Sequence, residues 1–140
     1  MAKRILIIDG QGGGLGRQLV QAIAAACPEA ELIAVGTNSV AATAMLKAGA
    51  ARAATGENAV IVNSRRADII VGPLGIVIAD ALLGEITPAM AAAVGQSDAK
   101  RVLIPVNNCD NYIVGVPECP VGRLVQAAAA QVKALCHGSC

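Results

Sequence analysis

The chain has 140 residues and a formal net charge of +1; 55% of its residues are hydrophobic, 15% are charged, and Tyr112 is its single aromatic residue. That length is typical of one domain, so we predict a single domain over residues 1–140. The near-zero charge and the lack of stacking rings argue against a nucleic-acid partner, and no run of about 18 uncharged apolar residues is present to cross a membrane.

The first predicted elements are a strand, a glycine loop and a helix. Residues 5–8 are apolar and mostly β-branched, which is typical of a buried strand. Apolar residues then recur at helical spacing as far as Cys27, where Pro28 ends the helix. Between them, a glycine-rich stretch directs backbone N–H groups to the start of a helix, where an anion such as phosphate is favoured. The candidate ligand-binding residues of this stretch are Asp9, Gly10, Gln11, Gly12, Gly13, Gly14, Leu15 and Gly16.

The glycine spacing narrows the ligand class. The dinucleotide fingerprint G-x-G-x-x-G fails because position 15 is leucine. The pattern G-x-x-x-G-x-G fits and resembles the cofactor loop of short-chain dehydrogenases. Those enzymes also carry Tyr-x-x-x-Lys, whereas Tyr112 is followed four positions later by Val116. We therefore reject hydride transfer of that type, and whether the chain is an enzyme stays open.

Residues 31–94 alternate between short apolar runs and helical patterns. The predicted strands are residues 31–35, 51–54 and 68–71. The predicted helices are residues 40–48, 59–66, 76–83 and 88–94. Residues 59–66 are ambiguous in the sequence between helix and strand, and the basic end of this segment favours a helix.

The remaining predicted elements are a strand at residues 101–106, a short extra strand at 112–116 and a helix at 121–136. Alternating strands and helices predict an α/β, Rossmann-like three-layer fold, with a mostly parallel sheet of about five strands plus the short extra one. Ligands bind such sheets at the carboxyl ends of the strands. The residues that add these strand ends to the candidate site are Thr37, Asn38, Gly72, Pro73, Leu74, Gly75 and Asn107.

The end of the second strand bears on the choice of cofactor. A domain that binds NAD normally has an acidic residue there for the ribose hydroxyls. This chain has Thr37 and Asn38 instead. NAD(P), a mononucleotide and a non-nucleotide phosphate ligand therefore all stay open.

Two carboxylates lie at strand ends. We predict that Asp9 braces the glycine loop by accepting its N–H groups, with a Mg²⁺ site as the alternative. Glu57 lies at the start of a helix, where capping is the favoured interpretation and a general base or metal ligand is the alternative.

The chain has five cysteines and no signal peptide, which is typical of reduced thiols in the cytoplasm. A cysteine-ligated iron–sulfur or zinc site is an alternative function, and its candidate ligands are Cys109, Cys119, Cys136 and Cys140. No pair has the C-x-x-C spacing of strong metal sites, so we favour free thiols with Cys109 in the ligand pocket.

The low content of charged residues indicates that this protein has a partner. Too few charged residues are present to cover all the predicted helices, and leftover apolar surface usually marks an interface. We therefore expect a homo-oligomer, and a non-catalytic oligomeric or regulatory subunit is a further alternative function.

Several longer motifs resemble a family of short bacterial proteins, common in anaerobes, that is classed as a domain of unknown function. The resemblance covers nearly the whole chain and implies a shared fold and site without a reaction. The motifs that carry it are IDGQGGGLG (residues 8–16), GTN (36–38), MLKAGA (45–50), ATGENAV (54–60), ADIIVGPLGI (67–76), LGEITPAMA (83–91), IPVNNC (104–109) and IVGV (113–116).

Overall fold

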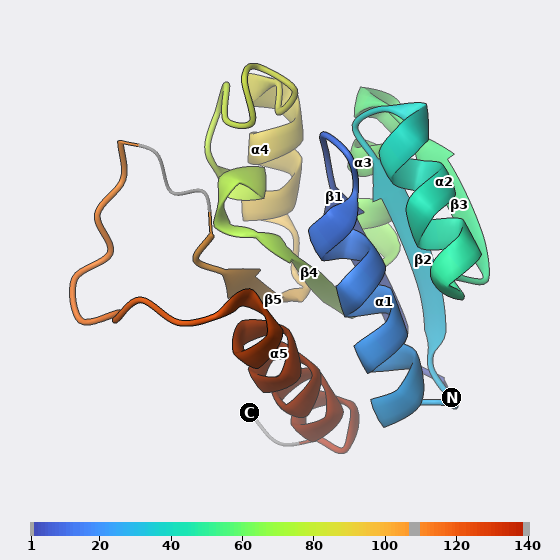
Figure 1. Ribbon diagram of the computed structural model, residues 1–140. Helices are drawn as coiled ribbons and strands as arrows, with labels where there is room; N and C mark the ends of the chain where they lie inside the picture. The colour runs from blue at the N-terminus through green and yellow to red at the C-terminus, as the bar shows by residue number, and fades with distance from the viewer. Residues whose placement is uncertain (1, 107–109, 139–140) are drawn as a thin grey trace.

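A parallel sheet forms the middle layer of the computed structural model, which describes residues 2–106 and 110–138. Its five strands lie in the order β3-β2-β1-β4-β5, and every neighbouring pair is parallel. The strands are β1 (Arg4–Asp9), β2 (Glu31–Gly36), β3 (Arg52–Thr55), β4 (Ile69–Pro73) and β5 (Lys100–Ile104). The predicted α/β, Rossmann-like fold class is therefore confirmed (Figure 1).

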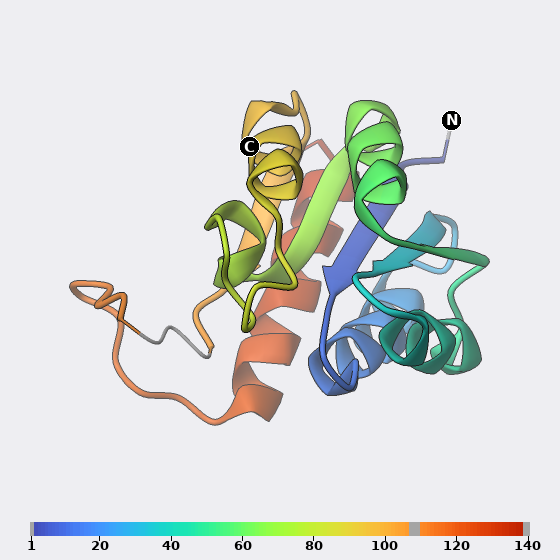
Figure 2. The same cartoon turned by 90° about the horizontal axis from the view of Figure 1, so that it is seen from above.

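Helices cover both faces of this sheet. One face carries α1 (Gly14–Ala26), α2 (Ser39–Ala48) and α5 (Val121–Cys136), and the other carries α3 (Glu57–Arg66) and α4 (Pro88–Gln96) (Figure 2). The segment predicted ambiguously at residues 59–66 is thus helical. No helix in the described ranges is both long and apolar enough to cross a membrane.

The central strand β1 explains why two cores form. Successive side chains of a strand point to opposite faces of the sheet. Ile5 and Ile7 pack towards α1, α2 and α5, whereas Leu6 and Ile8 pack towards α3 and α4. All four side chains are buried, which is why the strand has no polar alternation in the sequence.

The sheet order reverses next to β1. The chain runs from β1 outwards to β2 and β3, then returns through α3 to place β4 on the other side of β1. Such a reversal leaves a crevice outside the carboxyl ends of the two strands, the usual ligand position in open α/β sheets. The glycine loop, residues 10–16, begins at this point.

The helix predicted at residues 76–83 is wrong. A 3₁₀ helix, η1 (Leu74–Val77), ends β4, and residues 78–86 form a succession of bends and turns. Asp80, Leu82 and Leu83 have left-handed backbone conformations that a right-handed helix excludes. The turn instead buries Ile86 in the core, with the Asp80 N–H donating to the Ile86 carbonyl over 2.7 Å.

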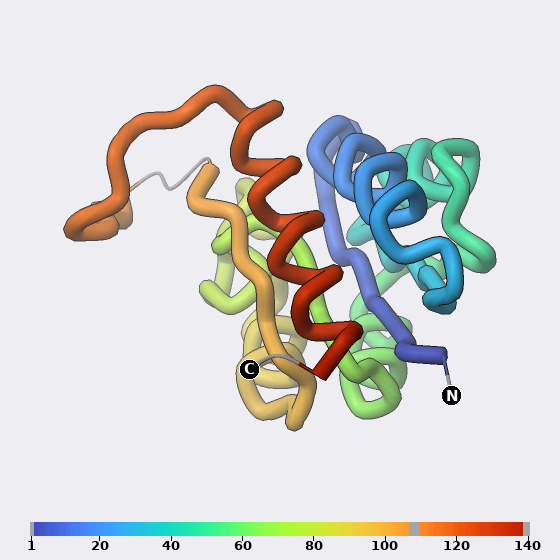
Figure 3. Tube along the Cα trace, turned by 90° about the horizontal axis from the view of Figure 1, so that it is seen from below, coloured from blue at the N-terminus to red at the C-terminus, as the bar shows by residue number. Residues whose placement is uncertain are grey.

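The extra strand predicted at residues 112–116 is also wrong, because the described residues 110–120 contain turns and irregular backbone. A strand needs a neighbouring strand for its hydrogen bonds, and this segment extends away from the sheet (Figure 3). Tyr112 is 92% exposed as a result. The predicted site residues Asn107 and Cys109 lie outside the described residues.

Candidate functional site

The glycine loop leads from β1 directly into α1. The Gly13 N–H donates to the Gly10 carbonyl over 2.9 Å, which closes a tight turn. Gly13 precedes the first residue of α1 with a φ of 75°, and a Cβ there would lie 2.8 Å from the Cα of Ala41. Only glycine combines this conformation with this approach to α2.

Asp9 braces the loop, as its position at the end of β1 predicts. The Gly16 N–H donates to the Asp9 Oδ2 over 2.6 Å, and the residue is buried. Burial raises the pKa of this carboxyl, the N–H groups of Gly16 and Gly10 oppose that shift, and the charge of Glu85 adds to it.

The start of α1 has unused hydrogen-bond donors. Within the described residues, the backbone N–H groups of Gly12, Gly14 and Leu15 make no hydrogen bond to the protein. The first N–H groups of a helix have no partner within the helix; here Asp9 accepts that of Gly16, and no side chain accepts those of Gly14 and Leu15. A Cβ at Gly12 or Gly14 would meet no atom within 4 Å, so the backbone is open to an approaching group.

Glu85, from the 78–86 turn, reaches the other side of the glycine loop. Its Oε1 accepts the Gln11 N–H over 2.6 Å and the Thr37 hydroxyl over 2.9 Å. Its Oε2 accepts the Asn38 side-chain amide over 3.2 Å. Gly10 is required beneath it, since a Cβ there would lie 2.5 Å from Oε1. The glycine loop therefore already holds one carboxylate.

The sequence patterns did not identify Glu85 as a site residue. It lies between the helices predicted at residues 76–83 and 88–94, and within the family motif at residues 83–91. The one available signal was an acidic residue directly after Gly84 and before the Thr87-Pro88 helix start.

Asn38 connects three parts of the site. Its Oδ1 accepts the Ala41 N–H over 2.9 Å and caps α2, while its Nδ2 donates to the Gln11 carbonyl over 2.9 Å. The Thr37 N–H donates to the Asp9 carbonyl over 3.0 Å. The predicted residues at the end of β2 thus lie against the glycine loop.

The predicted residues at the end of β4 have clear packing contacts. A Cβ on Gly72 would lie 2.5 Å from the Ile8 carbonyl, and one on Gly75 would lie 3.2 Å from the Cβ of Ala81. Pro73 is the last residue of β4 and Leu74 the first of η1. These four residues bring the 78–86 turn to the carboxyl edge of the sheet, beside the glycine loop.

Glu57 lies at the first position of α3, where an acidic residue suits the helix dipole. Its Oε1 accepts the Thr87 hydroxyl over 2.6 Å, and Thr87 also caps α4 through the Met90 N–H. The contact joins the starts of two helices, but Glu57 caps neither of them: α3 has no side-chain cap, so the capping interpretation of Glu57 is wrong.

The described cysteines are free thiols. Burial, followed by the neighbouring Cys136, raises the pKa of the Cys27 thiol to about 11. Among the described residues, no three His, Cys, Asp or Glu side chains are grouped to hold a metal ion. The proposed ligands Cys109 and Cys140 lie outside those residues.

Comparisons with known proteins address the family. The sequence matches the family described as a domain of unknown function (DUF3842) over residues 4–137. No curated protein and no solved structure matches the chain. Because the match spans nearly the whole chain, the protein belongs to the DUF3842 family.

Proposed function

We propose that this protein binds a phosphate-containing small molecule, in the first place a nucleotide, at the glycine loop. The observation that carries the proposal is the set of unpaired N–H groups on Gly12, Gly14 and Leu15, at the start of the 13-residue helix α1. Such donors, together with the helix dipole, favour a bound phosphate. They also lie at the reversal point of the sheet.

Glu85 favours a nucleotide over a simple phosphate. Its carboxylate lies at the end of β2, against Thr37 and Asn38, where dinucleotide-binding domains have the acid that accepts ribose hydroxyls. A carboxylate has about four acceptor positions, and three donors from the protein reach this one. One position is left for a ribose hydroxyl, while a phosphate takes the N–H groups of the helix start.

The test is a thermal-melt screen with inorganic phosphate, NAD, NADP, ATP, GTP, FMN and coenzyme A at millimolar concentration. At about ten times Kd, a ligand stabilises the folded protein by about 1.4 kcal/mol, a shift of a few degrees in Tm. Gly14→Ala should abolish the shift, because the added methyl group enters the space that the ligand needs. The fold itself tolerates this methyl group, since a Cβ at Gly14 would meet no protein atom within 4 Å.

Gly122→Ala is the matched control, since it also lies in the first turn of a helix and also faces open space. Glu85→Gln should weaken the binding of a nucleotide several-fold more than the binding of inorganic phosphate. Glu118→Gln, in an exposed loop, is the control and should change neither. If no phosphate compound raises Tm, or if Gly14→Ala binds as well as the natural protein, the proposal is wrong.

A second candidate function, an oligomeric subunit, is favoured by one specific observation. Leu83, Tyr112 and Val114 are 98%, 92% and 97% exposed. Large apolar side chains exposed to this degree favour burial against a partner. We propose a second copy of the chain as that partner.

A further inference from the structure

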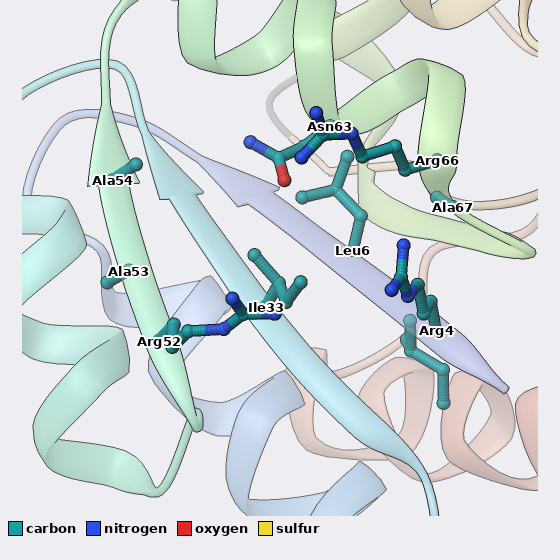
Figure 4. A pocket seen from close by; sticks show the side chains of 10 residues that line it. Arg4, Leu6, Ile33, Arg52, Ala53, Ala54, Asn63, Arg66 and Ala67 are labelled. Carbon is teal, nitrogen blue, oxygen red and sulfur yellow. The ribbon is translucent and has the colours of Figure 1, made fainter. Parts of the chain in front are cut away.

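A cavity lies at the amino ends of the strands, at the opposite edge of the sheet from the glycine loop. Its volume is about 290 Å³, and Arg4, Arg52 and Arg66 line it (Figure 4). Arg4 and Arg52 are the first residues of β1 and β3, and Arg66 is the last residue of α3. Three elements far apart in the sequence thus bring three guanidinium groups to the amino ends of the strands.

The floor of this cavity is apolar. Leu6 of β1, Ile33 of β2 and Ala54 of β3 contribute to it from the same face of the sheet. α3 and α4 pack on the central part of that face, and Ile33 is left half-buried. Small ligands are usually bound in such apolar hollows, with a few polar groups at the rim to orient them.

The charges at the rim are unbalanced. Glu31 pairs with Arg52 over 2.6 Å and more weakly with Arg4 over 3.9 Å, and Asp68 accepts only the backbone N–H of Arg4. In the described part of the chain, the guanidinium group of Arg66 has no ion pair or hydrogen bond. No described acidic residue lines the cavity itself.

Asn63 adds a hydrogen-bond acceptor to the cavity, whereas the three arginines supply donors. Its Nδ2 donates to the Ala59 carbonyl over 2.8 Å, which fixes the amide. Its Oδ1 is directed over the cavity, near Leu6 (Figure 4). The rim therefore offers guanidinium donors on several sides and one acceptor above an apolar floor.

We propose that this cavity binds a small organic anion, with its carboxylate or phosphate group on Arg66 and the neighbouring arginines and its apolar body on Leu6 and Ile33. The guanidinium group matches both anions, because its planar N–H donors pair with two oxygens at once. The size of the cavity suits a compact molecule, at the lower end of the usual range for ligand pockets. This site is independent of the glycine loop and does not rest on the proposed function.

The test is a titration of the ¹⁵N-labelled protein with phenyl phosphate, followed by backbone amide shifts. We expect saturable shifts at Leu6, Ile33 and Ala54 at millimolar concentration. Arg66→Gln should weaken this binding about three- to tenfold, since it removes a charged donor at a partly exposed site. Arg65→Gln is the control, because it removes the same charge from the same helical turn and does not line the cavity.

Further probes separate the contributions of charge and apolar body. Benzoate should bind at the same residues, whereas inorganic phosphate and benzyl alcohol should each bind at least tenfold more weakly than phenyl phosphate. If Arg66→Gln does not retain the natural amide spectrum, Arg4→Gln takes its place. Absence of saturable shifts at the cavity, shifts confined to residues 10–16, or equal weakening by Arg65→Gln would each overturn the proposal.

Discussion

Two carboxylates share the glycine loop and have different surroundings. Asp9 is buried beneath the loop, where the backbone N–H groups of Gly16 and Gly10 interact with its carboxyl group. Glu85 lies at its outer side with three donors. Desolvation dominates at Asp9 and raises its pKa, so the charged form of this residue is disfavoured in the folded protein.

The raised pKa of Asp9 predicts the direction of a pH effect. The folded chain binds this proton more tightly than the unfolded chain, so its contribution to stability is greatest at low pH. That contribution falls as pH rises from 3.8 through the folded pKa. Asp9→Asn keeps an oxygen acceptor for the Gly16 N–H and removes the titrating carboxyl group. Each unit by which the pKa of Asp9 is raised on folding corresponds to about 1.4 kcal/mol in the free energy of unfolding.

Urea unfolding of the natural protein and Asp9→Asn, at steps between pH 3.5 and 7.5, is the measurement. The difference in free energy of unfolding between the two should move in favour of the variant as pH rises. An exposed substitution, Asp98→Asn, is the control. A difference that stays constant with pH, or moves in favour of the natural protein, would contradict this prediction.

At the scale of elements, the loop between β1 and α1 separates glycines needed for folding from glycines open to a ligand. A Cβ at Gly16 would lie 2.6 Å from the Met45 Sδ and 2.8 Å from the Asp9 Cβ. Gly12 and Gly14 face open space. The same motif thus packs α1 against α2 on one side and exposes N–H groups on the other.

This division predicts opposite results for two alanine variants. Gly16→Ala should lower the free energy of unfolding by about 1–3 kcal/mol, because the added methyl group overpacks the contact with α2. Gly14→Ala should leave stability unchanged or raise it by up to about 1 kcal/mol, because alanine favours the helix. Chemical denaturation measures both, and a Gly16→Ala protein as stable as Gly14→Ala would show that the contact is not tight.

At the scale of the molecule, the apolar surface is concentrated in segments that leave the sheet. Leu83 lies in the 78–86 turn, and Tyr112 and Val114 lie in the extension before α5 (Figure 1). Covering these side chains would remove large apolar areas from water, at about 25 cal/mol per Å². The described chain offers no such cover.

Association should therefore depend on these side chains. Light scattering at high protein concentration should give a mass above the 14.0 kDa of one chain. A Tyr112→Ser, Val114→Ser double variant should shift the mass towards the monomer without loss of Tm, because neither side chain packs on the core. Val40→Ser, at an exposed apolar position of α2, is the control. A monomeric natural protein would refute the oligomer hypothesis.

The sequence by itself determined the strand–loop–helix unit, the parallel α/β class and the bracing of the loop by Asp9. These features depend on neighbouring residues: apolar runs, helical spacing and the glycines between them. The strand ends at Thr37 and Asn38 were predictable for the same reason, since parallel strands bring their carboxyl ends to one edge of the sheet.

Only the tertiary structure decided the remainder of the site. Gln11 and Glu85 are 74 positions apart, and no local pattern relates them. The apolar residues at 76–83 fit a helix as well as a turn, and burial of Ile86 selected the turn. Residues 112–116 have strand composition but no strand beside them. Arg4, Arg52 and Arg66 converge only because β1 and β3 lie in one sheet and α3 contacts both strands. Contacts between distant segments set these features, because local preferences are weak compared with the burial of a side chain.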